Sequence, residues 1–570
     1  MREAAGSAAG PRRFGGLTPR GWLAVACAVH VAAGLLLFEP TLFPGGDNAG
    51  YMILGRALRT LRGYRDLYLP AAPLHTKYPP AYPALLAVLG WAGGVQLFKL
   101  ASLALTTAAV ALTGLIGRRW LGAAGGVLAA FVVALNPVLL EYGHYVLSEA
   151  PFVALVLFSL WGLSEGSPLP AWVGYVAVAA AFLTRTAGLP LLGAAVLAPL
   201  LARRWRRAGV ALAVAALAAG GWSLYQHLAA PDQTGYLRQL VLANPYDPAA
   251  GTVGVAGLVT RAARNLWSYV SGILPGSLTG GGAAAGAPGA GAGLPTLAGL
   301  LLAALGVTGW IRRALRRLDV AGLFTLLYGA EIALWPSVWT DRRFLLPVLP
   351  LVLLYVLVGA RAAAMGALRR GGRPSAAGSR AAAGDDDGPG RRAARLGGAV
   401  AAAAMLLPGA VYLFSTAPGR VRCIADYRAG TPCEAPAMSS FYAAARWARE
   451  NLPPDAVVAN RKPRLFYWFS NRRGDVYRFT SDTDLLLDGL DAMGAGYVVL
   501  DAISATTYQY LVPAVRAHAE RFTVVFRNGD PPTWILAYRP PGGTALGPPS
   551  PGGADPGSAA RRRTGSRAAR

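Results

Sequence analysis

Residues 96–139 read QLFKLASLALTTAAVALTGLIGRRWLGAAGGVLAAFVVALNPVL, and this stretch decides the fold class. Two apolar segments, 96–117 and 121–139, flank the pair Arg118 and Arg119. Each segment has about the 17 to 25 residues that a helix needs to cross a bilayer. Arginines in a short loop between two such segments are typical of the cytoplasmic side of a membrane. The stretch therefore predicts two transmembrane helices joined inside the cell.

The same pattern continues in both directions along the chain. Of the 570 residues, 54% are hydrophobic and only 14% are charged, whereas an average soluble domain has about 25% charged residues. Apolar segments of roughly spanning length predict a polytopic bundle of about eleven transmembrane helices. Besides the two above, the expected spans are 22–38, 146–163, 171–187, 189–201, 208–228, 296–311, 321–339, 344–360 and 396–414.

The formal net charge of +26 would suggest nucleic acid as a partner for a soluble protein. Here the arginines cluster in short loops, as in RRWRR at 203–207 and RRALRR at 312–317, where the positive-inside rule expects them. We therefore exclude nucleic acid and expect the cell inner membrane, with the N-terminus in the cytoplasm and the C-terminal domain outside. The segment 82–91 is too short to span and is interpreted as an interfacial helix.

The expected organisation follows from these segments. A cytoplasmic tail (1–21) precedes a transmembrane bundle (22–360) with long outer loops at 39–95 and 229–295, the second holding a Gly/Ala-rich insert. A polar stretch (361–395) reads as a disordered cytoplasmic linker before the last span, and 541–570 as a disordered tail.

Between them, residues 415–540 predict a small extracytoplasmic α/β domain. The segment FYAAARWARENL reads as an amphipathic helix, DAVVAN as a short buried strand, LLLDGLDAMGA as a second helix and GYVVLD as a second strand. A hairpin is expected in FTVVFRNGDPPTWILAYRP, with its turn at 528–532.

Two cysteines lie ten residues apart in a polar segment, Cys423 and Cys433, while Cys27 falls in the first span. In an oxidising compartment a disulfide closing the short loop is plausible, and two free thiols are an equally good interpretation.

A carboxylate follows the first span at Asp47, within the loop FPGGDNAGYMILGRALRTLRGYRDLYLPAAPLHTKYPPAYP. At a membrane surface a carboxylate can accept a proton from a hydroxyl group, as a general base does. An alternative is that Asp47 caps the helical run 49–61, because Asp is a common N-cap residue.

Four elements in order resemble the integral-membrane C-type glycosyltransferases, including the protein-mannosyltransferase-like (family 39-like) and lipid-A arabinosyltransferase-like families. They are the Asp47 loop with Tyr51, Gly63 and Tyr64, the YPPAYP helix start, the RRFLLPVLP element at Arg342 to Pro350, and a soluble C-terminal domain. The resemblance implies inverting transfer of a sugar from a polyprenyl-phosphate donor to a lipid, glycan or protein acceptor on the outer face. In that scheme Asp47 is the general base.

The resemblance also implies cations that stabilise the departing lipid phosphate. Arg185 is the most informative, since charge within an apolar span is expensive, although snorkelling to the interface would also explain it. The other candidate substrate-binding residues with it are Lys77, His75, Tyr78, Arg342 and Arg343. The last two arginines could instead anchor lipid headgroups.

A second polar cluster, LLEYGHYVLSEAPF, contains Glu141, His144 and Glu149. Glu149 could bind the acceptor or a divalent ion, or could interact with the helix dipole as a first-turn carboxylate. No cofactor is required by the pattern, and metal use stays open because members of the superfamily differ. Residue 48 is Asn, so no acidic pair follows the first span.

Two other functions remain open. A transporter or flippase of a lipid-linked or small polar solute would also be a multi-span bundle, although no twofold repeat is visible and transport does not explain the terminal soluble domain. A catalytically silent scaffold is the third interpretation. The donor sugar, lipid carrier and acceptor are not specified by any motif.

Overall fold

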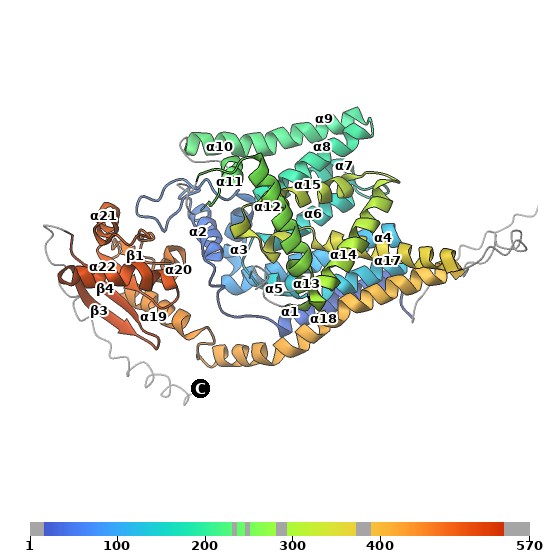
Figure 1. The fold of residues 1–570 in the computed structure, drawn as a ribbon. Coiled ribbons are helices and arrows are strands. Elements are labelled where there is room, and N and C mark those ends of the chain that lie inside the picture. The colour runs from blue at the N-terminus through green and yellow to red at the C-terminus, as the bar shows by residue number, and fades with distance from the viewer. Residues whose placement is uncertain (1–15, 231–235, 246–250, 281–292, 372–388, 541–570) are drawn as a thin grey trace, which may run out of the picture. The chain divides into compact units, whose positions relative to one another are not determined.

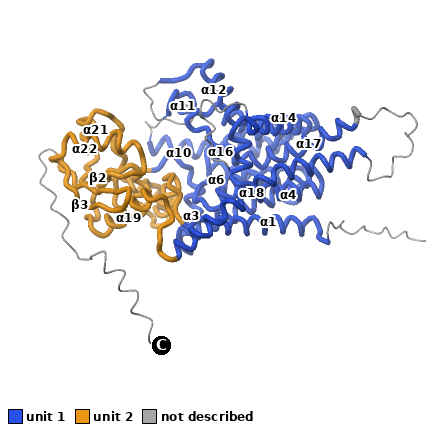
Figure 2. The backbone as a smooth tube through the Cα atoms, turned by 60° about the horizontal axis from the view of Figure 1, so that its bottom comes forward, with its two compact units in different colours: residues 1–40, 75–428 blue, residues 41–74, 429–570 orange. Residues whose placement is uncertain are grey.

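The structure is a computed structural model that describes residues 16–230, 236–245, 251–280, 293–371 and 389–540 (Figure 1). The chain divides into two compact units, which are described separately (Figure 2). Unit 1 comprises residues 1–40 and 75–428, and unit 2 comprises 41–74 and 429–570. The expected Gly/Ala-rich insert, the middle of the linker and the C-terminal tail lie outside the described residues.

Unit 1 is a bundle of apolar helices, and the predicted polytopic helical fold is confirmed. Among the described residues, six helical stretches are long and apolar enough to cross a membrane, and five shorter helices are also apolar. The long stretches are α1 (Pro19–Leu36), α4 (Val95–Ala134), Trp205–Ala229 comprising α9 (Trp205–Ala215) and α10 (Gly221–Ala229), α14 (Leu294–Ala314), α17 (Leu349–Gly371) and α18 (Pro389–Arg428). The shorter ones are α3 (Ala81–Ala92), α6 (Glu149–Leu163), α7 (Ala171–Thr184), Thr186–Leu201 with α8 (Leu189–Leu201), and α15 (Val320–Leu334).

The opening stretch of sequence forms α4, which is interrupted at Gly122. This glycine has φ 79° and ψ 177°, a backbone conformation that only glycine adopts readily. It lies three residues after Arg119. The two apolar segments are therefore separated close to the position that the arginine pair indicated. The second segment ends at Ala134, and α5 (Pro137–Tyr142) follows after Asn136 caps it.

Several predicted boundaries differ from the structure. The expected outer loop 229–295 contains helices α11 (Tyr236–Val241), α12 (Val255–Ser268) and α13 (Leu274–Thr279). Arg and Asn side chains interrupt the apolar pattern of α12, which hid it from a search for spans. The expected linker 361–395 also begins and ends as helix, because α17 runs on to Gly371 and α18 starts at Pro389.

Unit 2 joins part of the first loop to the C-terminal domain. Helix α2 (Asp47–Arg59) packs on α20 (Pro463–Ser470), and the loop after it is bonded to the domain through its backbone. Gly474 donates its N–H to the Tyr68 carbonyl at 2.9 Å, and Arg473 donates to the Pro70 carbonyl at 2.9 Å. The sequence suggested one loop from 39 to 95 outside this domain, whereas residues 41–74 are part of its unit.

The predicted α/β elements of the C-terminal domain are confirmed. A four-stranded sheet has the order β1 (Val458–Ala459), β2 (Tyr497–Leu500), β4 (Thr533–Tyr538) and β3 (Phe522–Asn528). Strands β1 and β2 are parallel, and the hairpin β3–β4 adds antiparallel to β2 with Val498 opposite Leu536. Helices α19 (Pro436–Asn451), α21 (Thr483–Met493) and α22 (Val512–Ala517) complete the fold.

The apolar core of this domain forms because β2 is buried throughout most of its length. Val498 and Val499 are fully buried, and Leu486 and Leu490 of α21 pack into the same core. Neither Cys423 nor Cys433 is a free thiol, whereas Cys27 is.

Candidate functional site

The first polar cluster, in unit 1, is built around Glu149. This residue begins α6 and its side chain is fully buried. Arg185 Nη1 lies 2.5 Å from Glu149 Oε1 and donates a second hydrogen bond to Ser148 Oγ at 2.9 Å. Arg343 Nε also donates to Glu149 Oε1. Two guanidinium groups therefore converge on one buried carboxylate.

Local backbone structure explains how these side chains meet. Helix α7 ends at Thr184, so Arg185 lies just after the helix in extended conformation, with φ −150° and ψ 134°. The predicted span 171–187, which included Arg185, is therefore too long at its end. Arg343 lies in the short helix α16 (Arg342–Leu345), within the RRFLLPVLP element. Glu149 is in the first turn of α6, a position where a carboxylate is favoured by the helix dipole.

A second ion pair extends this cluster. Arg342 Nη2 lies 2.9 Å from Glu141 Oε1, and the Tyr145 hydroxyl donates to the same oxygen at 2.9 Å. His144 lies between the two carboxylates in sequence and is 3% exposed. Its ring contacts Phe38 and Tyr145, and within the described residues neither ring nitrogen has a hydrogen-bond partner. His144 is therefore packed as an aromatic side chain here.

Sequence reasoning missed Glu331 in the apolar helix α15. Its Oε2 atom is buried without a hydrogen-bond partner among the described residues, and its carboxyl group interacts electrostatically with Arg185. A carboxyl group inside an apolar helix is costly and is by default a functional-site hypothesis. The signal was present in LLYGAEIALW, at 326–335.

The arrangement suits an anion with several oxygens. A guanidinium group is planar and presents its N–H donors as a fork that matches phosphate or carboxylate oxygens. Arg185, Arg342 and Arg343 are oriented by Glu149 and Glu141, which fixes the direction of each fork before a ligand arrives. Such pre-orientation lowers the entropic cost of binding.

His75, Lys77 and Tyr78 form a separate group in unit 1. His75 is 2% exposed, and its Nε2 accepts the backbone N–H of Tyr78 at 2.8 Å. The Tyr225 hydroxyl donates to the carbonyl of His75 at 3.1 Å. Lys77 is exposed, with its ammonium 5.6 Å from the centre of the Tyr78 ring. His75 thus shapes the loop, and Lys77 is the cation of this group.

Asp47 belongs to unit 2, where it is the first residue of α2. The N-cap is Gly46, with φ 88°, and no side chain caps this helix. The expected capping role is therefore wrong, since Asp47 lies one position inside the helix. Asn48 beside it is fully buried and donates to the Phe43 carbonyl at 2.9 Å.

Basic residues of the C-terminal domain surround Asp47, and the sequence analysis overlooked them. Arg464 Nη1 lies 3.5 Å from Asp47 Oδ1, and both side chains are partly exposed. Lys462 Nζ donates to the Pro44 carbonyl at 2.7 Å. The run NRKPR at 460–464, directly after strand β1, was the available signal.

A carboxyl group lies at the edge of the sheet where the basic run 460–464 follows β1. Because β1 and β2 are parallel, their carboxyl ends meet, and Asp501 follows β2 as Arg461 and Lys462 follow β1. Burial raises the pKa of Asp501 to about 6, although hydrogen bonds from the Ile503 N–H and the Thr507 hydroxyl lower it. Burial lowers the pKa of Lys462, with Arg461 adding to the effect.

A metal centre finds no support in the part of the chain that the structure describes. No group of three or more His, Cys, Asp or Glu side chains there is placed to hold a metal ion.

Comparisons with known proteins identify the fold. No protein-family model and no curated protein matches the chain. Among solved structures, it resembles the archaeal oligosaccharyltransferase AglB from Archaeoglobus fulgidus, in complex with an inhibitory peptide and a dolichol-phosphate. The TM-score is 0.53 at 14% identity, covering 93% of this chain and 75% of that chain.

Two further structures are similar. The same archaeal enzyme in complex with Zn and sulfate gives a TM-score of 0.50 at 14% identity, covering 91% of this chain and 73% of that one. ArnT from Cupriavidus metallidurans bound to undecaprenyl phosphate gives 0.49 at 15% identity, covering 91% and 98%. The two oligosaccharyltransferase structures confirm the expected resemblance to C-type integral-membrane glycosyltransferases for the fold alone.

Proposed function

We propose that the chain is a membrane glycosyltransferase that moves a sugar from a polyprenyl-phosphate donor to an acceptor on the outer face of the cell inner membrane. The observation that carries this proposal is the convergence of Arg185 and Arg343 on buried Glu149, within a fold shared with a glycosyltransferase. That relative was solved with a dolichol-phosphate, which is a lipid phosphate of the class proposed here.

The arginines would bind the phosphate of the donor. When the bond between the anomeric carbon and the phosphate oxygen breaks, the electron pair stays on the phosphate, and its negative charge grows. Arg185, Arg342 and Arg343 stabilise that charge, which is larger in the transition state than in the bound donor. Glu149 and Glu141 hold the guanidinium groups in place and do not take part in the bond changes.

Asp47 would be the general base. The acceptor hydroxyl oxygen attacks the anomeric carbon from the face opposite the leaving phosphate, which inverts the configuration at that carbon. The proton of the hydroxyl passes to a carboxylate oxygen of Asp47. Arg464, 3.5 Å from Asp47, holds this carboxylate by charge attraction.

The remaining candidate residues would assist substrate binding. Lys77, the exposed cation of the His75–Tyr78 loop, would contact the sugar or phosphate, while His75 and Tyr78 shape that loop. No step in this scheme requires a metal ion, although a divalent ion bound with the donor's phosphate would be compatible with it.

A panel of labelled polyprenyl-phosphate sugars, offered to vesicles that contain the purified full chain and candidate lipid, glycan and protein acceptors, tests the proposal. Transfer of label from at least one donor, absent from protein-free vesicles, is the expected result. Movement of intact lipid-linked sugar across the vesicle membrane with no transfer would instead show that the protein is a transporter or flippase. The donor that reacts identifies the sugar.

A further inference from the structure

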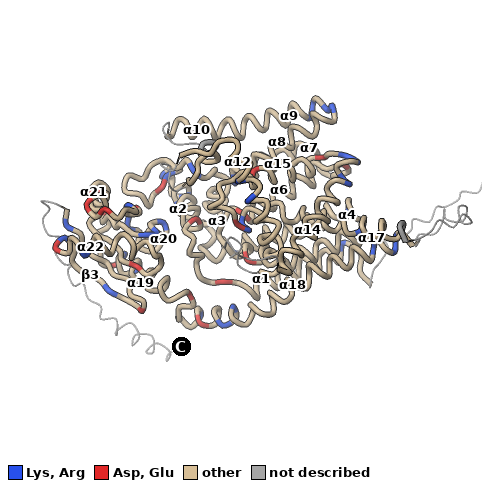
Figure 3. The backbone as a smooth tube through the Cα atoms, in the orientation of Figure 1, with Lys and Arg blue, Asp and Glu red and all other residues tan. Residues whose placement is uncertain are grey.

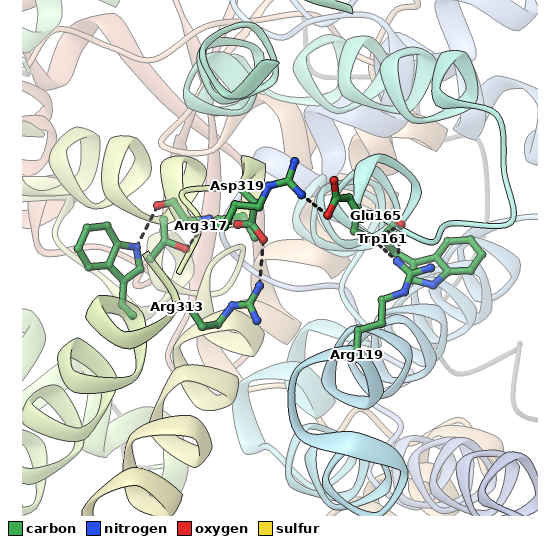
Figure 4. Close-up of polar contacts among 11 residues, drawn as sticks. Arg119, Trp161, Glu165, Arg313, Arg317 and Asp319 are labelled. Atoms are coloured by element: carbon green, nitrogen blue, oxygen red, sulfur yellow. Dashed lines mark hydrogen bonds and ion pairs between the residues drawn. The ribbon is translucent and has the colours of Figure 1, made fainter. Parts of the chain in front are cut away.

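Unit 1 has a cavity of about 650 Å³, and none of the residues proposed to act in sugar transfer lines it. Eight arginines and two carboxylates, Glu165 and Asp319, surround it. Its arginines come from the end of α14 and the loop after it, from the loop after α8, and from α4, α9 and α17. The loop after α6 contributes Glu165 (Figure 4). The cavity is a second site, distinct from the cluster around Glu149.

Helix direction places the two sites at opposite ends of the bundle. Glu149 begins α6, whereas Glu165 follows its last residue, Leu163, and a 15-residue helix is about 22 Å long. Helix α15 gives the same result, since Asp319 caps its first turn and Glu331 lies near its end. If the Glu149 cluster faces outward, the arginine cavity faces the cytoplasm, as the positive-inside rule requires.

The two carboxylates neutralise only part of the positive charge. Glu165 pairs with Arg204 at 2.9 Å. It also pairs with Arg317, and Asp319 pairs with Arg313 at 2.9 Å (Figure 4). Eight arginines against two carboxylates leave an excess of six positive charges around one cavity. Figure 3 marks basic residues in blue along the backbone at the start of α9.

Some arginines here hold the fold together, and others do not. Arg119 donates to the carbonyls of Trp161 at 2.8 Å and Gly166 at 3.0 Å, and Arg361 donates to the Leu121 carbonyl at 2.6 Å. In contrast, the side chains of Arg207, Arg312 and Arg316 make no hydrogen bond or ion pair with another described residue.

The inner wall of the cavity is apolar. Ile116, Leu160, Pro199 and Val358 contribute to it, and all four lie within or at the end of apolar helices. Trp120 also lines the cavity, with the Arg313 guanidinium 3.8 Å from the centre of its ring. Tryptophan and arginine together are typical of the depth of lipid headgroups.

We propose that this cavity binds the headgroup of an anionic phospholipid of the inner leaflet, with its acyl chains along the apolar wall. Phosphate oxygens are the ligands that an unpaired guanidinium group prefers, and basic pockets between transmembrane helices on the cytoplasmic side bind such headgroups. Arg207, Arg312 and Arg316 contact the phosphate. The proposal concerns a binding site and does not depend on glycosyl transfer.

Native mass spectrometry of the purified full chain, titrated with phosphatidylglycerol or with phosphatidylcholine, tests it. Wild type should retain phosphatidylglycerol at least tenfold more tightly than phosphatidylcholine. The double variant Arg312→Gln/Arg316→Gln should bind phosphatidylglycerol about 30-fold more weakly. Each of the two arginines near the anionic headgroup contributes a similar part of the binding free energy, so their effects on the dissociation constant multiply. Both side chains are exposed, so the variant is expected to fold, and its elution as a single species checks this.

The matched control is Arg118→Gln/Arg203→Gln, which removes the same charge from neighbouring arginines that do not line the cavity. It should bind phosphatidylglycerol like wild type. Glu165→Gln should change affinity in the opposite direction, because it removes a carboxylate that competes for Arg204 and Arg317.

Three results would overturn the proposal. One is an equal loss of phosphatidylglycerol affinity in the control and in Arg312→Gln/Arg316→Gln, which would show that only the total charge of the protein matters. Another is retention of phosphatidylcholine as tight as that of phosphatidylglycerol. The third is displacement of phosphatidylglycerol by inorganic phosphate at equal concentration, which would identify a soluble anion as the ligand.

Discussion

Arg185 and Glu149 are joined by an ion pair of 2.5 Å that connects the end of α7 to the first turn of α6. The carboxylate is fully buried and also accepts a bond from Arg343, which is 194 residues further along the chain. A buried charge is tolerated only when it is paired. The three residues therefore depend on one another, and their geometry is set by three separate helices.

Replacing Arg343 with Gln should weaken use of the lipid-phosphate donor. The substitution removes a charged donor of the proposed phosphate site while Arg185 keeps Glu149 paired, so the fold should survive. Loss of one such hydrogen bond predicts a KM for the donor about tenfold higher or more. Steady-state transfer with increasing donor measures it.

Arg264→Gln is the matched control for this variant, because Arg264 is an exposed arginine of α12 in the same unit. It should leave KM unchanged. Equal KM and kcat values for Arg343→Gln and wild type would show that the cluster around Glu149 is structural only.

Much of the helical bundle could be predicted because hydropathy and length alone define a span. Helix α8 begins and ends where the sequence placed it, and Gly122 separates the two halves of α4 beside the predicted arginine pair. Helices that carry polar residues were missed, as in α12 with Arg261 and Asn265. Their side chains bond to carbonyls of other segments, and such partners are not visible in a local pattern.

The candidate site was predictable only in part. Arg185, Glu149 and Arg343 stood out as charges next to apolar segments, and the structure brings them together. Arg464 did not stand out in the sequence. Its position beside Asp47 depends on the packing of α2 against α20, which is more than 400 residues further along the chain. No periodicity or motif reports a contact of that kind.

Gly122→Ala should destabilise unit 1. A side chain at φ 79° and ψ 177° costs on the order of 1–3 kcal/mol, and nothing lies within 4 Å of the added methyl group to offset this. Gly209→Ala in α9 also meets no neighbour, but its backbone is helical, so it should stabilise by about 0.5–1 kcal/mol. Thermal unfolding in detergent compares the two, and equal shifts would contradict the strain argument.

Asp501 should make the C-terminal domain less stable as the pH rises. Its pKa of about 6 in the folded chain is above the usual value near 3.9, so the folded state binds the proton more tightly. Its stabilising contribution is complete below about pH 4 and is lost as the pH passes through 6, by on the order of 3 kcal/mol.

Resistance of this domain to limited proteolysis, measured in the full chain between pH 4 and pH 7, tests this. Asp501→Asn should reduce the pH dependence, since Asn keeps the acceptor for Ile503 and Thr507 and cannot ionise. Asp488 is an exposed carboxylate on α21, and Asp488→Asn should leave the pH dependence unchanged. An unchanged slope in Asp501→Asn would assign the pH dependence to other groups.

Arg464→Gln should lower kcat more than it raises KM. Arg464 contacts Asp47 and is not proposed to bind the donor, so its loss misplaces the base without removing a phosphate contact. We expect a decrease in kcat of about tenfold or more, because an ion pair that orients the base is lost. Arg464→Lys should recover part of it. A rise in KM alone would show that Arg464 binds substrate.

The role of Asp47 is the central claim, and transfer by Asp47→Asn at matched expression tests it most directly. Asn keeps the size of the side chain but cannot accept the acceptor's proton, so transfer from the reactive donor should fall about 100-fold or more. Asp455→Asn, an exposed carboxylate of the same unit, should transfer like wild type. Full activity of Asp47→Asn would contradict the account and place the base elsewhere.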